Sequence, residues 1–414
     1  MGIGGRAMRG WVVLLLLAGS TWPAWAAKSV SVGQLESLLD KLRGKSDGKV
    51  AEELSDLELT ERVSLARLAK WEALFQGSRS HEALEKLADL SALSDPPAGD
   101  VEPISAPDNE TQERMLAVAA EYVKTTITRL PDFFATRETR YFLAAPSLEA
   151  VVASGSKPLG PGSDATRAPG IAIGSSELKS LHNTGSSSAT VTYRNGREVY
   201  DATAAGGAKE NEQAKGMATS GEFGPILAVV MGDAMRSEVE WLRWEQAASE
   251  PLAVFRYAVP VEQSNYEVGI PADGKTERVK TGYHGEIAID PATGAILRVS
   301  AIAVLGPPHE LVQAAVVVEY APVAIGERSY ICPARGVAFF RAPIHIAGKP
   351  QSGPAIPVEL EMNEVRFTQY HVFRSEARIV TNDGGTGDAP AGAPQPAPAS
   401  PSESSGTAPE NHRP

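Results

Sequence analysis

The spacing of apolar residues predicts helices in the N-terminal part of the chain and strands in most of the remainder. Three stretches place apolar side chains three and four residues apart, on one face of a helix. These side chains are Leu35, Leu38, Leu39 and Leu42, then Leu65, Leu68, Trp71 and Phe75, then Leu84, Leu87 and Ala88. Gly44 and Gly77 end the first two helices, and Ser80 is the expected cap of the third. We therefore expect a small helical module over residues 27–94.

A linker and a longer helix follow this module. Residues 95–108 are rich in proline, which disfavours regular structure. Over residues 109–131 the helical period returns, and Pro131 marks the end of that helix. Its apolar stripe consists of Met115, Ala119, Tyr122 and Val123.

From Phe133 the pattern changes to the alternation that is typical of strands. The segments that show it include "TRETRYFLA", "LAVFRYAVP", "QAAVVVEYAPV", "RSYICPARGVAFF" and "EVRFTQYHVFRSEARIV". Asn195-Gly196 predicts a hairpin tip within "ATVTYRNGREVYDA". A segment rich in glycine, serine and proline, about residues 155–174, is expected to be a mobile loop. The succession of strands and turns indicates a large antiparallel sheet over residues 132–381.

One helix is predicted to interrupt these strands, near residues 225–245. Pro225 suits its first turn. Its apolar face would contain Leu227, Val230, Met231, Ala234 and Trp241. Helices before and among antiparallel strands place the chain in the α+β class.

The segment "GYHGEIAIDPATGAILRVSAIA", residues 282–303, predicts a hairpin in detail. Asp290 and Pro291 suit the first corners of a type I turn, and Gly294 suits a left-handed bulge residue. On the return strand Val299 shares a face with Leu297 and Ala301, whereas Arg298 and Ser300 share the other. This alternation predicts a half-buried strand.

The N-terminal residues predict export, and the C-terminal residues predict a disordered tail. Residues 1–26 combine Arg6 and Arg9, an apolar run and Ala24-Trp25-Ala26, as a cleaved secretory signal does. The run is shorter than a membrane-spanning helix requires, so no transmembrane segment is expected after cleavage. Residues 382–414 contain mainly proline, alanine, glycine and serine and are expected to be disordered. We expect a periplasmic or secreted protein.

Charge and cysteine content narrow the choice of partners. The formal net charge is −12, so the overall field does not favour nucleic acid. Cys332 is the sole cysteine and cannot form an internal disulfide, so we interpret it as a buried structural thiol. The seven histidines lack the spacing of a metal site on one helix, although His284 and His371 could meet in space. No phosphate-binding glycine pattern occurs, and we expect neither a metal nor a cofactor.

The strand order of the last third resembles a known family. The segments "YHGEIAIDPATGAILRV" and "VVVEYAPVAIGERSYICPA" are similar to periplasmic lipoprotein-carrier-like domains. The resemblance implies a curved half-barrel sheet around an apolar concavity. The segments "LSDLELTERVSLARLAKWEALFQG" and "LPDFFATRETRYF" also resemble uncharacterised exported proteins of soil bacteria. The expected fold is thus a helical module, then a curved, half-barrel-like antiparallel sheet with a packed helix, then a disordered tail.

Three functions are compatible with this reading. The first is a non-enzymatic envelope protein that carries or senses an apolar, lipid-like ligand or a lipoprotein. A groove for an apolar ligand or an envelope protein would be lined by Trp241, Trp244, Phe255 and Tyr257. The second is a structural or protein-interaction module in which the same rings are core and the sheet is fully covered.

The third function is an enzyme. The order of "SELK", "YRN" and "KTG" resembles that of serine acyl-enzymes such as penicillin-binding proteins. That resemblance implies Ser176 as nucleophile, Lys179 as proton acceptor and Lys280 for carboxylate recognition. The nucleophile should open a long helix, yet Asn183 and Gly185 break the helical pattern within two turns. This reading therefore ranks below the other two.

Overall fold

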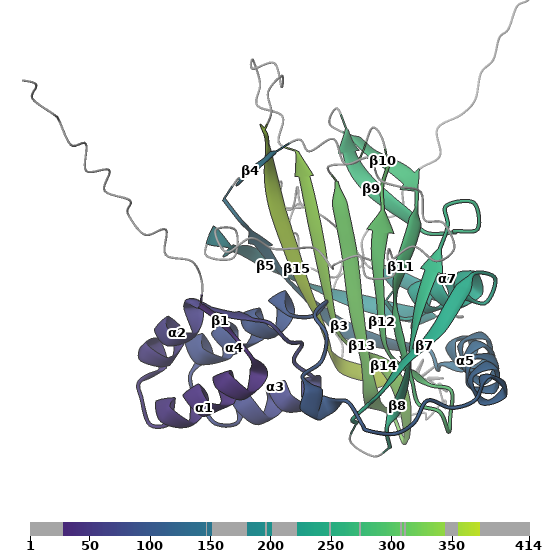
Figure 1. Ribbon diagram of the computed structural model, residues 1–414, viewed down its shortest axis with the longest axis horizontal. Coiled ribbons are helices and arrows are strands. Elements are labelled where there is room, and N and C mark those ends of the chain that lie inside the picture. Colours follow the sequence, from purple (N-terminus) through teal and green to yellow (C-terminus); the bar gives the residue numbers. More distant parts are fainter. Residues whose placement is uncertain are drawn as a thin grey trace, which may run out of the picture. The chain divides into compact units, whose positions relative to one another are not determined.

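Figure 1 shows the computed structural model of the chain. The structure describes residues 28–145, 147–150, 180–194, 197–200, 222–247, 250–272, 275–306, 309, 312–343 and 355–372. All of these belong to one compact unit. The predicted signal peptide, the loop at 155–174, the hairpin tip Asn195-Gly196 and the predicted tail at 382–414 lie outside the described residues.

Four helices and a short parallel strand pair form the helical module. They are β1 (Lys28–Val30), α1 (Val32–Leu42), α2 (Asp47–Ser55), β2 (Leu57–Leu59), α3 (Leu65–Glu72) and α4 (Ser78–Leu90). The apolar stripes of these helices meet in one cluster, in which Leu35, Leu39 and Leu84 are fully buried. The expected helix at Leu65 is short. Residues 57–59, which precede this helix, form the strand β2 and pair with β1, so they are not part of the helix.

The start of α4 differs from the prediction that Ser80 caps it. The helix begins at Ser78, with Gly77 as the N-cap residue. The free backbone N–H groups of Arg79 and Ser80 donate to the carboxylate of Asp47, at 3.2 and 2.8 Å. A cap from another helix therefore replaces the local one, because Asp47 lies against this turn in space.

The linker leads from this module to α5. It contains a single 3₁₀ turn, η1 (Ala98–Asp100), and pairs with the sheet through one isolated bridge from Val101 to Glu245. The helix α5 (Asn109–Arg129) is capped by Asp108, whose Oδ1 accepts a hydrogen bond of 2.8 Å from the backbone N–H of Thr111. Of its predicted stripe, Ala119 and Val123 are buried, and Met115 and Tyr122 are partly buried.

The remaining elements build an open antiparallel sheet, which confirms the predicted α+β class. Its strands are β3 (Phe133–Leu143), β4 (Ser147–Ala150), β5 (His182–Arg194), β6 (Arg197–Tyr200), β7 (Glu238–Glu245), β8 (Leu252–Val259), β11 (Gly282–Ile289), β12 (Ile296–Val304), β13 (Gln313–Ile325), β14 (Arg328–Pro343) and β15 (Ala355–Val372). The hydrogen-bonded order is β6-β5-β3-β15-β14-β13-β12-β11-β8-β7, with β4 beside β15. A separate hairpin consists of β9 (Glu267–Ala272) and β10 (Lys275–Lys280).

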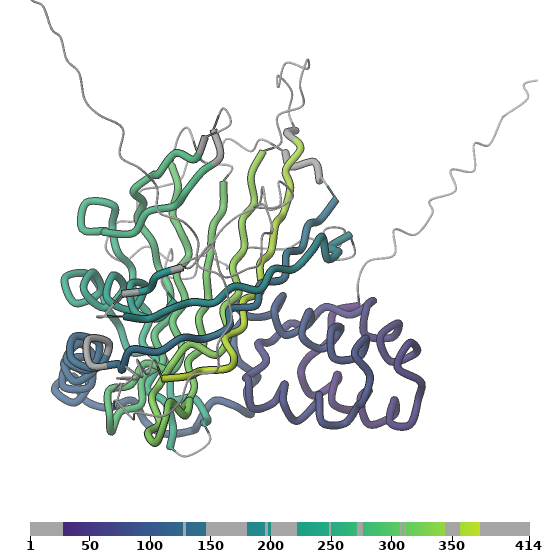
Figure 2. The backbone as a smooth tube through the Cα atoms, turned by 180° about the vertical axis from the view of Figure 1, so that it is seen from behind, coloured from purple at the N-terminus to yellow at the C-terminus, as the bar shows by residue number. Residues whose placement is uncertain are grey.

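The sheet is curved, so its two faces have different surroundings. In Figures 1 and 2, β3 and β5 run across the long strands β13 and β14 rather than along them. On the inner face, β5 and β14 contribute to one apolar cluster although two strands separate them in the sheet. The helices α5 and α7 (Pro225–Ala234) pack on this inner face. The end of α4 packs on the outer face, where Leu90, Ala92 and Leu93 join an apolar cluster of the sheet.

The helix predicted over residues 225–245 is wrong in its second half. The helix α7 ends at Ala234, and Trp241 and Trp244 lie on the strand β7. Residues 238–245 pair with β8 in an antiparallel ladder, which contains a bulge between Trp241 and Arg243. The free edge of β8 is thus satisfied by β7, which outweighs the helical spacing of the apolar residues.

The hairpin over residues 282–303 is confirmed. Gly294 has a φ of 75°, and its N–H donates to the carbonyl oxygen of Asp290 at 2.8 Å. The side chain of Asp290 closes the turn, because Oδ1 accepts from the backbone N–H of Ala292 at 2.9 Å and Oδ2 accepts from the hydroxyl of Thr293 at 2.8 Å. The predicted half-burial of the return strand is wrong. Arg298 and Ser300 are buried as well, because the outer face is also covered.

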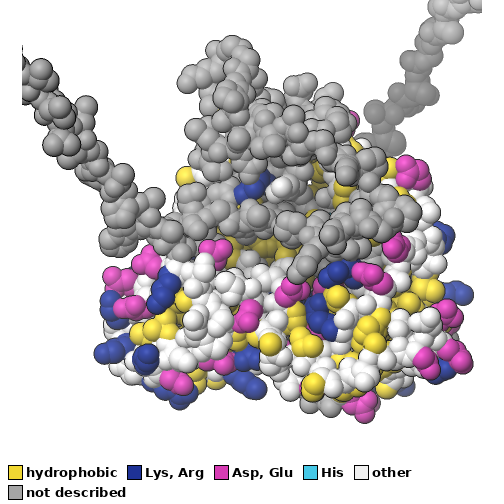
Figure 3. Space-filling view, in the orientation of Figure 1, with side chains coloured by type: hydrophobic (Ala, Val, Ile, Leu, Met, Phe, Trp, Pro, Cys, Tyr) yellow, Lys and Arg dark blue, Asp and Glu magenta, His cyan; other side chains and the backbone are white. Residues whose placement is uncertain are grey.

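No helix among the described residues is long and apolar enough to cross a membrane. In Figure 3, Lys and Arg side chains alternate with Asp and Glu side chains over the helical module. Charges of one sign do not gather into a large patch on the described part of that face.

Candidate functional site

The four aromatic residues predicted to line a groove lie close together. Trp241 and Phe255 are cross-strand partners on β7 and β8, with ring centroids 5.4 Å apart. The ring of Trp244 lies 4.9 Å from that of Trp241. Phe255 and Tyr257 are each 1% exposed and belong to the core, whereas Trp241 and Trp244 are partly buried against it. Only the tryptophans therefore reach the surface of this cluster.

An apolar cluster fills the space between the inner face and the helices α5 and α7; we call it the inner cluster. Its buried members are Ala119, Val123, Leu227, Val230, Met231, Ala234, Ala253, Phe255, Tyr257, Val259, Tyr283, Ile287, Ile289, Ile296, Val299, Ala301, Val316, Val318, Tyr320 and Ala338. Five strands contribute to its floor, and the two helices form its cover. Among the apolar clusters of the described residues, this one has the most buried members.

A polar clasp fixes the end of α7 to the sheet. Asp233 is fully buried and accepts hydrogen bonds from the backbone N–H and side-chain amide of Asn265, at 2.7 and 2.6 Å. It also accepts from the hydroxyl of Tyr283 at 3.0 Å and from Arg236 at 2.8 Å. Burial and the nearby Asp233 carboxylate raise the pKa of Tyr283 far above its usual range. Tyr283 therefore stays a neutral donor, and the clasp is a structural group.

A second, aromatic cluster lies at the far end of the inner face; we call it the aromatic cluster. It contains Phe133, Tyr193, Phe223, Phe367 and Tyr370. The centroids of neighbouring rings in this cluster lie 4.7–6.3 Å apart. Such offset and edge-on ring pairs stabilise beyond the area they bury. Its rings come from the neighbouring strands β3, β5 and β15 and from the segment before α7, so the cluster joins that segment to this part of the sheet.

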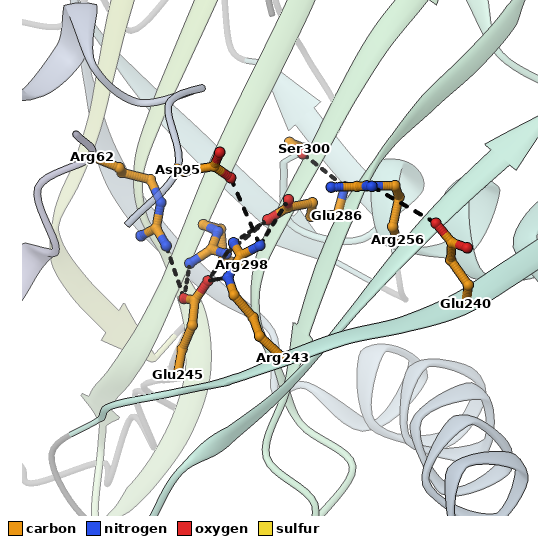
Figure 4. Close-up of polar contacts among 9 residues, drawn as sticks. All are labelled: Arg62, Asp95, Glu240, Arg243, Glu245, Arg256, Glu286, Arg298 and Ser300. Carbon is orange, nitrogen blue, oxygen red and sulfur yellow. Dashed lines mark hydrogen bonds and ion pairs between the residues drawn. The ribbon is translucent and has the colours of Figure 1, made fainter. Parts of the chain in front are cut away.

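The outer face carries a network of buried charges where the helical module meets the sheet (Figure 4). The carboxylate of Glu245 receives Arg62 of the module at 2.8 Å and Arg298 of β12 at 2.8 and 3.0 Å. Arg243 bridges Glu245 at 2.6 Å and Glu286 at 2.7 Å. Burial alone would raise the pKa of the Glu245 carboxyl, but the three guanidinium groups hold it well below its usual range. Glu245 is therefore a permanent anion.

The network continues across the sheet to α4. Arg335 of β14 contacts Asp89 of α4 and lies 3.2 Å from Glu319 of β13. Burial, helped by the nearby Glu364 carboxylate, raises the pKa of Asp89 to about 7, although Arg335 acts in the opposite direction. Two further arginines of the sheet, Arg140 and Arg366, contact Glu85 of α4. Each contact joins the module to the sheet, so the network fastens the two together.

The cysteine, the histidines and the lysine that the sequence offered as reactive or metal-binding candidates do not come together in the described part of the chain. Burial raises the pKa of Cys332 to about 12, so this thiol is unreactive at neutral pH. His284 and His371 do not meet, because three strands separate β11 from β15. Among the described residues, no group of three His, Cys, Asp or Glu side chains could hold a metal ion. Ser176 and Lys179 lie outside the described residues, and Lys280 ends β10.

Sequence reasoning missed the charged network. The sequence does contain a signal for it, because several apolar strands have a charged residue in the middle. Such a residue would ordinarily be assigned to a solvent-exposed face. Examples are Glu286 in "GEIAI", Arg298 in "ILRVS" and Glu319 in "VVVEY". Opposite charges on successive strands of one meander could have indicated a cross-strand ladder, since such pairs stabilise when they are opposite each other.

Comparisons with known proteins do not assign a family. No protein-family model matches the chain, and no curated protein or solved structure matches it.

Proposed function

We propose that the chain is an exported, non-enzymatic binding protein of the cell envelope that carries or senses an apolar, lipid-like ligand between the sheet and its two covering helices. The observation that carries this proposal is the inner cluster. Among the described residues, the open sheet presents this apolar cluster on its inner face, and α5 and α7 cover it. A ligand could take the place of side chains from these helices.

The helix α5 is the element best suited to move. Among the α5 side chains that the structure describes, Ala119 and Val123 are buried in the inner cluster, whereas Met115, Leu116, Ala120 and Tyr122 are only partly buried against it. Val118 on the same helix is 39% exposed. A helix whose apolar face is mostly half-buried is held less firmly than a fully buried one, since most helical stability in proteins comes from packing an apolar face. Displacing α5 would uncover the apolar floor that a lipid chain needs.

The sequence adds two supports. The N-terminal 26 residues have the composition of a secretory signal, which would take the protein to the envelope. The last third resembles periplasmic lipoprotein-carrier-like domains, in which a curved sheet encloses an apolar concavity. The open curved sheet of this chain is compatible with that arrangement.

A protein-interaction module is the second candidate. It is favoured by the burial of Phe255 and Tyr257 and by the charged network that covers part of the outer face. In that case the inner cluster is a permanent core, and the contact surface lies on loops and edges. An acyl-enzyme ranks third.

Brominated lipids can distinguish these candidates. After residue 27 the sequence contains only three tryptophans, Trp71, Trp241 and Trp244. Trp71 is buried in the helical module, and the other two lie against the inner cluster. Bromine atoms on an acyl chain quench tryptophan fluorescence at short range. We expect a phospholipid with brominated chains to quench the Trp71→Phe variant, in which only Trp241 and Trp244 report, in a saturable manner.

The matched control is the double variant Trp241→Phe/Trp244→Phe, in which only Trp71 reports. Its fluorescence should not respond to the same lipid. Native mass spectrometry of the exported protein should in addition detect a bound lipid. Quenching in neither variant, with no bound lipid, would reject the carrier proposal and favour the interaction module.

A further inference from the structure

Glu222 is a buried carboxylate that lies between the inner cluster and the aromatic cluster. It lies three residues before Pro225, the first residue of α7, and is 3% exposed. Its carbonyl oxygen accepts a hydrogen bond of 3.0 Å from the hydroxyl of Tyr320, which belongs to the inner cluster. The next residue, Phe223, belongs to the aromatic cluster, and its N–H donates to Glu198 at 2.6 Å. Contacts on both sides thus hold the backbone of Glu222 in place.

The side chain of Glu222 is only half satisfied. Its Oε1 accepts from Arg137 of β3 at 3.2 Å. Its Oε2 is buried and accepts no hydrogen bond. Arg137 also donates to the hydroxyl of Thr139 at 3.0 Å, so its guanidinium does not serve Glu222 alone.

A buried carboxylate oxygen without a donor is unfavourable, because it has lost its water and gained no replacement. Buried polar groups in folded proteins are almost always paired, and an exception requires an explanation. The surroundings of Glu222 are largely apolar and aromatic, which strengthens any charge-assisted bond formed there. The missing partner should therefore be a donor that carries a positive charge.

We propose that Glu222 binds the ammonium headgroup of an amphiphilic ligand whose alkyl chain lies along the inner face. This inference rests on the proposed function and names the class of ligand. Arg137 orients the carboxylate through Oε1, and Oε2 accepts the N–H of the headgroup. The rings of the aromatic cluster lie on the same inner face as this carboxylate and provide favourable contacts for a cation.

Four amphiphiles with the same 12-carbon chain test this assignment. Dodecylammonium has charge and N–H donors, dodecyltrimethylammonium has charge without donors, dodecanol has a neutral donor, and dodecanoate has negative charge. Each would compete with the fluorescent probe 1-N-phenylnaphthylamine on the full exported chain at neutral pH. We expect dodecylammonium to bind at least about tenfold more tightly than each of the other three, the ratio for one charge-assisted hydrogen bond.

The variant Glu222→Gln should weaken dodecylammonium about tenfold and leave dodecanol within a factor of about two, since only the charge is removed. The matched control is Glu121→Gln on the exposed part of α5, which should change neither. Equal binding of all four amphiphiles to the wild-type chain would overturn the headgroup assignment and leave the proposed function intact. If neither the probe nor any amphiphile binds, the proposed function fails as well. The wild-type ranking decides the matter even if Glu222→Gln does not fold.

Discussion

At the scale of single residues, a comparison of two glycines distinguishes the cost of backbone strain from the cost of a steric clash. Gly44 and Gly294 have nearly the same positive φ, 77° and 75°. A Cβ at Gly44 would meet no atom within 4 Å, whereas a Cβ at Gly294 would lie 2.7 Å from the carbonyl oxygen of Val118 on α5. The turn of the hairpin thus requires glycine for two reasons, conformation and the close approach of α5.

We expect Gly294→Val to lower the free energy of unfolding by roughly 3 kcal/mol or more, because strain and overpacking add. Gly44→Val should cost roughly 1–2 kcal/mol, which is the strain alone. Asp290→Asn should be mild, since Asn keeps an acceptor for the turn. Urea unfolding of the three variants measures these values. Equal losses at both glycines would show that α5 yields to the new side chain without cost.

At the scale of elements, the first turn of α4 depends on a residue from α2. The carboxylate of Asp47 caps this turn, and its hydrogen bonds with Ser80 hold the pKa of Asp47 below its usual range. A Cβ on Gly77 would lie 1.9 Å from Oδ1 of Asp47. Gly77 has an ordinary φ of −97°, so glycine is required there for space and not for conformation.

We therefore expect Asp47→Ala and Gly77→Ala each to lower the melting temperature, because both remove the same cap. The double variant should lose little more than the worse single variant, since the two changes share one interaction. Thermal unfolding followed by circular dichroism tests this. Additive losses would mean that Gly77→Ala acts through another contact. Gly33→Ala, where a Cβ meets nothing within 4 Å, is the control for added bulk.

At the scale of the whole molecule, buried ion pairs connect the helical module to the sheet. Buried pairs stabilise little compared with apolar contacts, but removing one partner is costly. Asp89 has the most unusual environment of the set. It faces Arg335, and the carboxylate of Glu364 and the guanidinium of Arg366 also act on its pKa.

The pKa of about 7 for Asp89 makes stability depend on pH. A carboxyl whose folded pKa lies above its unfolded value contributes most when protonated, below its unfolded pKa. That contribution is lost as the pH rises towards the folded pKa. We expect the free energy of unfolding to fall between pH 5 and pH 8, relative to Asp89→Asn, by on the order of 1–4 kcal/mol.

His284 shifts stability in the opposite direction over part of this window, because burial lowers its pKa. The difference between wild type and Asp89→Asn cancels that contribution, since both chains contain His284. Urea unfolding at several pH values provides the measurement. Parallel curves for the two proteins would show that Asp89 is ionised in the folded chain throughout, paired with Arg335.

The core of the fold could be predicted wherever the pattern is local. The period of Leu35, Leu39 and Leu84 predicted helices, and Asp290 with Gly294 predicted a hairpin that the structure contains in detail. The contacts among the candidate groove residues could be predicted in part, whereas the groove itself stays a prediction. Trp241 and Phe255 do meet, but on paired strands, and Phe255 is core. Spacing gave the right neighbours for the wrong reason, since residues three apart can also be brought together by a bulged strand.

The sequence by itself determined which segments are apolar on one face, where turns close and which class of fold results, because these depend on residues close together in the chain. Only the tertiary structure decided that residues 238–245 form a strand, because the unpaired edge of β8 supplies hydrogen bonds that no local pattern reveals. It also decided that Arg298 and Glu222 are buried, because burial depends on which distant elements cover a face. The partners of both charges come from other parts of the chain, and no spacing within one segment encodes them.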